Sequence, residues 1–254
     1  MFIVMYHSLL IGASTLIPIP FLDDMLAAYL WKHLVSELAK SRGVKLTPAQ
    51  TSMFMPQSNL TCSGGCLFLT FTLLKKLFRE IAIWLEWRRG IDLATDAYYS
   101  GYLLNELFSS SFDPAESHQY AEAIRRAKKG VHTKLVRGVI ANTFKSGKNI
   151  VVAIRTWLYR ISVMYIKATF NSVRKLTKVF WRRKPRPETG ESDSPAETDI
   201  GEIFEENQPQ VDNLLRELIA HLQEGIGNLP KEHFDNLRNN MFEELRALEE
   251  KQGS

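Results

Sequence analysis

Apolar positions in the first half of the chain recur at helical spacing. Leucines and other large apolar residues fall three or four positions apart over 21–42, and the same spacing recurs over 66–89, 91–108 and 113–129. This spacing places the apolar side chains of each segment on one face. No useful stretch alternates between apolar and polar residues as a strand would. The pattern therefore predicts four amphipathic helices.

Local sequence signals mark where these helices begin and end. Gly43 is placed to end the first helix, since glycine readily adopts the conformation that closes a helix. The run from Thr47 to Gln50 has the form of a capping box with proline at the first helical position. Asp113-Pro114-Ala115-Glu116 repeats this logic. The intervening segment 56–65, rich in serine, asparagine and glycine, indicates a loop.

The region after residue 129 is punctuated by glycines and rich in basic residues. Gly130, Gly138 and Gly147 indicate two or three helices rather than one rod. The best defined covers about 149–181, with apolar side chains on one side and basic side chains on another. The apolar side holds Ile150, Ile154, Trp157, Leu158, Ile161, Tyr165 and Leu176. The basic side holds Arg160, Lys167, Arg174, Lys178 and Arg182.

The composition changes again after residue 183. Residues 184–202 are rich in proline, serine and acidic residues, which predicts a disordered linker. Residues 203–254 contain two amphipathic stripes joined near Gly225, which predicts a helical hairpin. So small a hairpin needs its apolar stripes covered by the protein's own body, a second copy or another protein. The side chains expected to bind this partner are Leu215, Leu218, Leu222, Phe234, Leu237 and Met241.

These patterns predict an all-α fold. Its multi-helix globular body would cover 1–183 and end in the basic amphipathic helix, with the linker 184–202 and the hairpin 203–254 after it. The chain has 254 residues and an apolar fraction of 45%, which is ample for a buried core. Its two cysteines imply no disulfide framework, so a reducing compartment is expected.

Charge divides the chain into three blocks. Residues 1–119 carry nine basic and ten acidic side chains, whereas 120–186 carry eighteen basic side chains and one acidic, Glu122. Residues 187–254 carry five basic and seventeen acidic side chains. Blocks polarised to this degree act through steering and surface binding more than through the fold.

The first 22 residues carry no formal charge except a possible one on His7, which raises the question of a signal peptide or a membrane span. No basic residue precedes the apolar run, as a secretory signal would require. Pro18 and Pro20 interrupt the run, and Asp23 and Asp24 follow, so it falls short of the roughly 20 apolar residues that a span needs. A buried or membrane-dipping helix is favoured over a span, and insertion of 1–17 stays open.

The basic helix over 149–181 admits three interpretations. It could be a core helix with a solvated basic face. It could instead lie on an anionic membrane, because it combines an apolar face, basic residues and aromatic residues at the flanks. It could also bind nucleic acid through its positive charge, although its aromatic residues favour the apolar side over base stacking. Lipid binding should require both Trp157/Ile161 and Arg160/Lys167, whereas nucleic-acid binding should respond mainly to the charges.

Candidate catalytic or metal-binding groups are sparse. Cys62 and Cys66 are separated by three residues, which is not the spacing of a thioredoxin pair, and no second Cys/His pair completes a zinc site. Asp23 and Asp24 could act with His33, but stabilisation of a helix start explains both acids. No nucleophile elbow or phosphate-binding loop is visible, so no cofactor or metal is expected.

The stretch Leu16-Ile17-Pro18-Ile19-Pro20-Phe21-Leu22-Asp23-Asp24, with the helix after it and the turn from Gly43 to Gln50, resembles a known helical domain of unknown function. That domain accompanies some bacterial GTPases and inner-membrane proteins and is similar to the EcsC-like family. The resemblance covers about residues 16–55. Arg42-Gly43 stands where the family has its "Tyr-Gly" or similar stop. The resemblance implies a helical, membrane-proximal and non-catalytic protein.

Taken together, these features favour a non-enzymatic module at the cytoplasmic face of the inner membrane. It would bind an anionic lipid surface through its basic helix and a protein partner through its tail. The side chains expected at the membrane or another anion are Arg155, Trp157, Arg160, Lys167, Arg174, Lys178 and Arg182. A nucleic-acid-binding protein is the second interpretation and an enzyme of unknown type the third. The acidic tail could also fold back and mask the basic helix, in which case deletion of 187–254 should strengthen liposome binding.

Overall fold

The described part of the chain folds into a bundle of helices. The computed structural model describes residues 1–17, 22–56, 79–110, 112–131, 133–161, 163–164 and 195–252, without the side chains of 22, 79–84, 195–208, 210 and 252. Every regular element in these ranges is a helix, so the all-α prediction is confirmed. Parts of three predicted segments lie outside the described residues. They are residues 57–65 of the loop, residues 66–78 of the helix over 66–89 and residues 184–194 of the linker.

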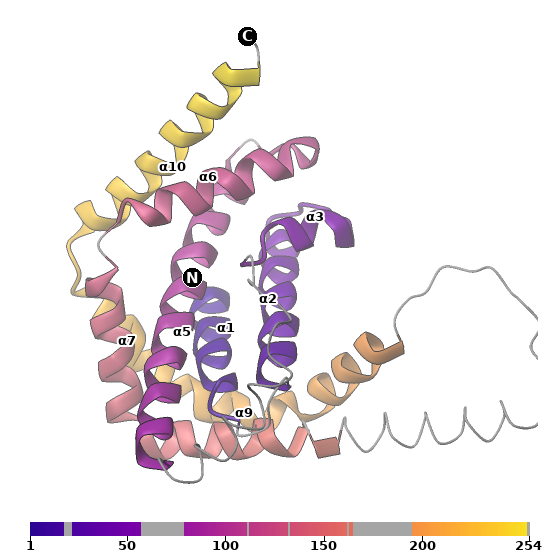
Figure 1. The fold of residues 1–254 in the computed structure, drawn as a ribbon, viewed down its shortest axis with the longest axis vertical. Coiled ribbons are helices and arrows are strands. Elements are labelled where there is room, and N and C mark those ends of the chain that lie inside the picture. Colours follow the sequence, from indigo (N-terminus) through magenta and orange to yellow (C-terminus); the bar gives the residue numbers. More distant parts are fainter. Residues whose placement is uncertain are drawn as a thin grey trace, which may run out of the picture.

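The first helix, α1 (Phe2–Ser14), forms the centre of the bundle. Eleven of its thirteen residues are buried, as expected for a helix that is apolar on all sides. It packs against α5 (Arg79–Ser109), α2 (Leu22–Ser41) and α9 (Pro195–Gly227). Figure 1 shows α1, α2 and α5 side by side, with α9 crossing one end of the group. The apolar N-terminus is therefore a buried core helix, and none of the described helices is long and apolar enough to cross a bilayer.

The predicted helix boundaries around residues 41–53 are confirmed. Gly43 ends α2 with φ of 71°, and the amide N–H of Val44 donates to the carbonyl of Ala39 at 2.9 Å. This left-handed closing residue favours glycine. Thr47 and Gln50 then form a complete capping box at the start of α3 (Pro48–Met53).

The cap predicted at Asp113 is also present. Its carboxylate accepts a hydrogen bond from the backbone N–H of Ala115 at 2.9 Å, at the start of the short 3-10 helix η1 (Pro114–Glu116). The helix α6 (Ser117–Lys129) follows directly and ends at Gly130. The sequence signals at this end are local hydrogen bonds, which explains why they could be recognised without the fold.

The predicted break near Gly90 is wrong, because α5 runs through it without interruption. A Cβ atom at Gly90 would lie 2.6 Å from the carbonyl oxygen of Gly12 and 2.8 Å from the hydroxyl oxygen of Thr15. Gly12 is equally confined, since its Cβ would lie 2.7 Å from the Cβ of Ala94. The two glycines allow the backbones of α1 and α5 to touch. Gly90 thus serves packing and does not end a helix.

We expect Gly90→Ala to lower the free energy of unfolding by about 1 to 3 kcal/mol, because its methyl group would force α1 away from α5. Gly138→Ala is the matched control. Gly138 lies inside α7 (Lys134–Ser146), and a Cβ there would meet nothing within 4 Å. The control should gain up to about 1 kcal/mol from helix propensity. Urea denaturation followed by circular dichroism measures both, and equal stability gains would contradict the close crossing.

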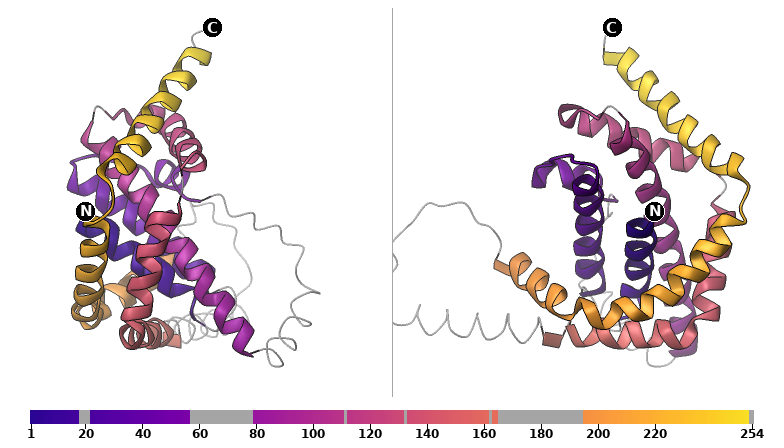
Figure 2. Two further views of the ribbon diagram at one scale, coloured as in Figure 1. Left: turned by 90° about the vertical axis from the view of Figure 1, so that its left-hand side faces the viewer. Right: turned by 180° about the vertical axis from the view of Figure 1, so that it is seen from behind.

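The two C-terminal helices are present, with their turn at 228–230, but they do not form a separate antiparallel pair. α9 begins at Pro195, earlier than the predicted linker end at 202, and α10 spans Lys231–Gln252. α9 packs on α1 and α7, whereas α10 packs on α6 and α5. Figure 2 shows the two helices wrapped around the body rather than folded on each other. They wrap because their apolar stripes face different parts of the core.

Candidate functional site

Three of the residues predicted to bind a membrane or anion, Arg155, Trp157 and Arg160, lie on a helix that covers 148–161. Its apolar side is buried: Trp157 is 7% exposed, and Ile154, Leu158 and Ile161 are also in the core. Arg160 is exposed and Arg155 is half-buried. The prediction that Trp157 and Ile161 face lipid is therefore corrected, because the protein's own body covers this side of the helix. Lys167, Arg174, Lys178 and Arg182 lie outside the described residues.

The opposite side of the 148–161 helix exposes large apolar side chains. Val152 is 47% exposed and Tyr159 is 42% exposed, and Met164, which is also helical, is 42% exposed. At about 100° per residue, Val152 and Tyr159 lie within roughly 20° of each other around the helix axis. On the same count Lys148 and Arg155 lie on one side of this pair and Arg160 on the other. The exposed face is therefore apolar at its centre and basic at its edges.

Part of the basic block is neutralised by ion pairs. Arg125 and Arg126 both bind Glu122, at 2.6 and 2.9 Å, and the hydrogen bond from Arg126 lowers the pKa of that carboxyl. Lys128 pairs with Asp96 at 2.6 Å. These contacts hold α6 together and attach it to α5, so these cations serve the fold first.

Among the described residues, other cations of the basic block have no ion pair, and three of them flank the exposed apolar face. The members without an ion pair in the described part of the chain are Lys129, Lys134, Lys145, Lys148, Arg155 and Arg160. Two of them lie on α7 and three on the 148–161 helix. These two helices follow each other across Gly147. This surface can attract an anion without first breaking a salt bridge.

The side chains predicted to bind a protein partner belong to the protein's own core. The buried set comprises Leu215, Leu218, Leu222, Leu237 and Met241. Phe234 is half-buried against Tyr102, with ring centroids 5.1 Å apart. Leu218 also occupies the space that a Cβ at Gly147 would need. The sequence allowed the protein's own body, a second copy or another protein to cover these apolar side chains. In the structure, the protein's own body covers them.

This burial changes how the masking hypothesis can be tested. Removal of 187–254 would uncover α1, α6 and α7, so a change in liposome binding would reflect exposed core. Substitution of acidic residues to their amides keeps the packing and tests the charge alone. The masking of the basic helix by the tail stays a prediction.

The acidic pair at the start of α2 contacts arginine and not histidine. Arg89 binds Asp23 at 3.2 Å and Asp24 at 2.6 Å. Burial, with a smaller effect from Asp24, raises the pKa of Asp23. The proposed partnership with His33 is therefore not formed, and the pair ties α2 to α5. Cys62 and Cys66 lie outside the described residues, and no group of three or more potential metal ligands occurs within the described ones.

A buried pair of histidines joins α1 to α2. The Nε2 atom of His7 lies 2.8 Å from Nδ1 of His33, and the Nδ1 atom of His7 lies 2.9 Å from the carbonyl of Ile3. Since a carbonyl can only accept, His7 carries its proton on Nδ1 and accepts at Nε2 from His33. Burial, offset in part by the bond to Ile3, lowers the pKa of His7 to about 4. The sequence carried one signal of this pair, a histidine within an apolar run, but its partner 26 positions away could not be inferred.

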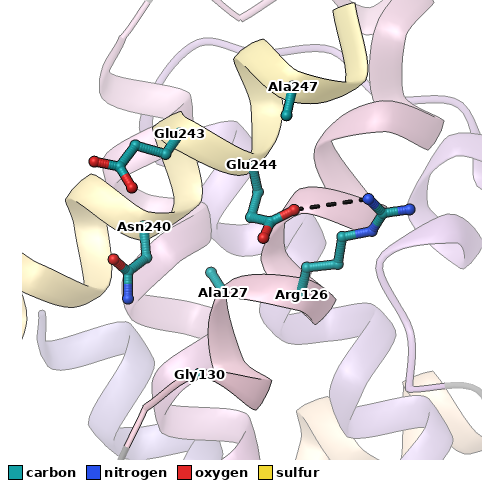
Figure 3. Close-up of a pocket in the computed structure, with 7 residues that line it drawn as sticks. All are labelled: Arg126, Ala127, Gly130, Asn240, Glu243, Glu244 and Ala247. Carbon is teal, nitrogen blue, oxygen red and sulfur yellow. Dashed lines mark ion pairs between the residues drawn. The ribbon is translucent and has the colours of Figure 1, made fainter. Parts of the chain in front are cut away.

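A shallow groove of about 290 Å³ lies between α6 and α10 (Figure 3). Arg126 reaches across it to Glu244, with 3.7 Å between the charged atoms. Small side chains, Ala127 and Ala247, and Gly130 also line it, as does Asn240. The described lining contains no histidine, hydroxyl or thiol that could act on a substrate. The groove is therefore the junction between α6 and α10, which the ion pair between Arg126 and Glu244 bridges.

The surface formed by the 148–161 helix is therefore the strongest functional candidate. It combines exposed apolar side chains with unpaired cations. Comparison of the chain with known protein families, curated proteins and solved structures finds no match. The resemblance over about residues 16–55 stays a prediction, and the function rests on the geometry of the molecule itself.

Proposed function

We propose that the protein is a non-enzymatic helical module that binds an anionic membrane surface through the exposed face of the 148–161 helix. The observation that carries this proposal is the exposure of Val152 and Tyr159 between unpaired basic residues. Apolar side chains of this kind enter the headgroup boundary while long basic side chains reach the lipid phosphates. The proposed partner is still the anionic membrane predicted from the sequence. The face of the helix that contacts it is the one with Val152 and Tyr159, not the one with Trp157 and Ile161.

The energetic scale is sufficient for reversible binding. Each basic side chain near an anionic bilayer contributes about 1 kcal/mol. Lys148, Arg155 and Arg160 would thus contribute about 3 kcal/mol, and the lysines of α7 would add to this. Insertion of the two apolar side chains supplies the part of the affinity that salt does not screen.

We expect the triple substitution Lys148→Gln, Arg155→Gln and Arg160→Gln to weaken binding to phosphatidylglycerol-containing vesicles by on the order of 100-fold. Co-sedimentation with vesicles of stated composition measures this, and vesicles of phosphatidylcholine alone give the baseline. The side chains involved are exposed or half-buried, so the fold should persist.

The matched control is a second triple substitution of exposed basic residues on other elements. Lys45→Gln, Arg246→Gln and Lys251→Gln remove the same charge from the α2–α3 turn and α10. This control should retain nearly all vesicle binding. If both triple variants lose equal affinity, net charge alone drives association and the assigned surface is wrong.

A nucleic-acid-binding function is the second candidate, favoured by the same unpaired cations. The two functions separate at the apolar residues. Val152→Asn with Tyr159→Gln should weaken vesicle binding while leaving binding to a DNA duplex unchanged. A steep fall of DNA affinity with salt, together with no preference for anionic vesicles, would favour the nucleic-acid function instead.

A further inference from the structure

A second hollow lies where the turn between α9 and α10 passes α5. It has a volume of about 320 Å³ and is distinct from the surface assigned to the membrane. Its lining includes Tyr98, Tyr102, Ile226, Leu229, Phe234 and Lys231. A space of roughly 300 Å³ is at the lower end of the range for small-molecule sites, which are mostly apolar with a few polar groups.

Tyr98 is the first of those polar groups. Its side chain is 0% exposed, and its hydroxyl has no hydrogen-bond partner among the described residues. The adjacent Tyr99 shows the ordinary alternative, since its hydroxyl lies 2.8 Å from Nε2 of His233. A buried hydroxyl without a partner costs about 1 to 3 kcal/mol, so native structures seldom keep one without a reason. Burial raises the pKa of Tyr98, which keeps this hydroxyl protonated and able to donate.

The walls of the hollow are aromatic. The ring of Phe234 is tilted against Tyr102 with centroids 5.1 Å apart and lies edge-on to Tyr98 at 6.3 Å. Such walls favour a flat ring, which can pack face or edge against them.

Lys231 is a cation at the rim, and Met1 also lines the hollow. Lys231 is exposed and has no ion pair in the described part of the chain. The only carboxylate in the described lining, Asp235, is already paired with Arg238 at 3.3 Å. A ligand that enters with a carboxylate at the rim would therefore meet a free ammonium group.

We propose that this hollow binds a small aromatic monocarboxylate with a hydrogen-bonding substituent at the far end of its ring. The ring packs against Tyr102 and Phe234, the carboxylate binds Lys231, and the substituent accepts a hydrogen bond from the Tyr98 hydroxyl. Because α9 and α10 meet at this hollow, the ligand would also stabilise the turn that joins them.

The test is an NMR titration of the full chain with 4-hydroxybenzoate and with benzoate, which lacks the distal hydroxyl. Wild-type protein should bind 4-hydroxybenzoate about 5 to 10 times more tightly than benzoate. In Tyr98→Phe this preference should vanish while benzoate affinity persists. Tyr98→Phe should also be at least as stable as wild type when free, because its hydroxyl has no bond to lose.

The charge at the rim is tested separately. Lys231→Gln should weaken both ligands to a similar extent, and Lys251→Gln, at the far end of the same helix, should weaken neither. Absence of saturable binding by the wild type would overturn the proposal. So would saturable binding that neither Tyr98→Phe nor Lys231→Gln alters, because the ligands would then occupy another site.

Discussion

Replacement of Trp157 by alanine is expected to lower the free energy of unfolding by about 3 to 5 kcal/mol, the range for loss of a large core aromatic residue. The indole is 7% exposed and belongs to the same core as Ile154 and Leu158. Alanine would leave a cavity between the 148–161 helix and the body. Urea denaturation followed by circular dichroism measures the change.

Tyr159→Ala is the matched control for this prediction. Tyr159 lies two positions along the same helix and is exposed, so its loss should change stability by less than about 0.5 kcal/mol. The two variants should therefore have opposite phenotypes: Trp157→Ala loses stability, and Tyr159→Ala loses vesicle affinity. A stable Trp157→Ala variant that fails to bind vesicles would return Trp157 to the membrane face.

Acidification is expected to destabilise the protein by about 2 kcal/mol between pH 7 and pH 5 through His7 alone, and by about 3 kcal/mol once pH 4 is reached. The pKa of His7 is lowered to about 4 in the native state by burial, whereas an unfolded histidine has a pKa of 6.5. Below pH 6.5 His7 is protonated in the unfolded chain but stays neutral in the native chain until the pH approaches 4. The contribution of neutral, buried His7 to the free energy of unfolding is therefore fully present above pH 6.5 and is lost as the pH falls towards 4.

Burial is the main obstacle to protonation of His7, and the paired imidazole of His33 adds a smaller one. His7 accepts from His33 at Nε2, so a proton at that atom would oppose the N–H of His33 until His33 changes tautomer. Glu37 acts in the opposite direction, since its charge favours protonation of His7, but burial outweighs it. Tyr6 lies against His7 and Tyr29 against His33.

Denaturation curves for wild type and His7→Asn at pH 7, 6 and 5 test this prediction above the range in which most carboxyl groups titrate. His7→Asn should be less stable at pH 7, because it loses the bond to His33, but its stability should fall less on acidification. His118→Asn removes a histidine from α6 and serves as the control. Parallel pH profiles for wild type and His7→Asn would refute the assignment.

The sequence predicted the features that depend on neighbouring residues. The capping box at Thr47 and the closing glycine at position 43 involve hydrogen bonds across three to five positions, so the residues that form them appear together in the sequence. The apolar face of the 148–161 helix was also predicted from its spacing. What covers that face was not, because an apolar stripe is the same whether it meets lipid or a helix from elsewhere in the chain.

Features that depend on distant residues could not be predicted in this way. Gly90 lies between the two helices predicted over 66–89 and 91–108, and only its contact with Gly12 shows that it permits a close crossing. The exposure of Tyr159 follows from the placement of Trp157 in the core, since the two side chains point in different directions from one helix. The pairing of His7 with His33 requires the packing of α1 on α2.

The contact between α1 and α9 has a consequence for synthesis of the chain. The hydroxyl of Tyr6 donates to Asp212 across 206 positions, so α1 gains this contact only after the residues between them have been synthesised. α1 can pack on α2 and α5 once they are made, but its contact with α9 waits for the intervening residues, which are translated at about 5 to 20 residues per second. Pairings so distant in sequence also slow folding. The helix α1 therefore completes its packing only after α9 has been synthesised.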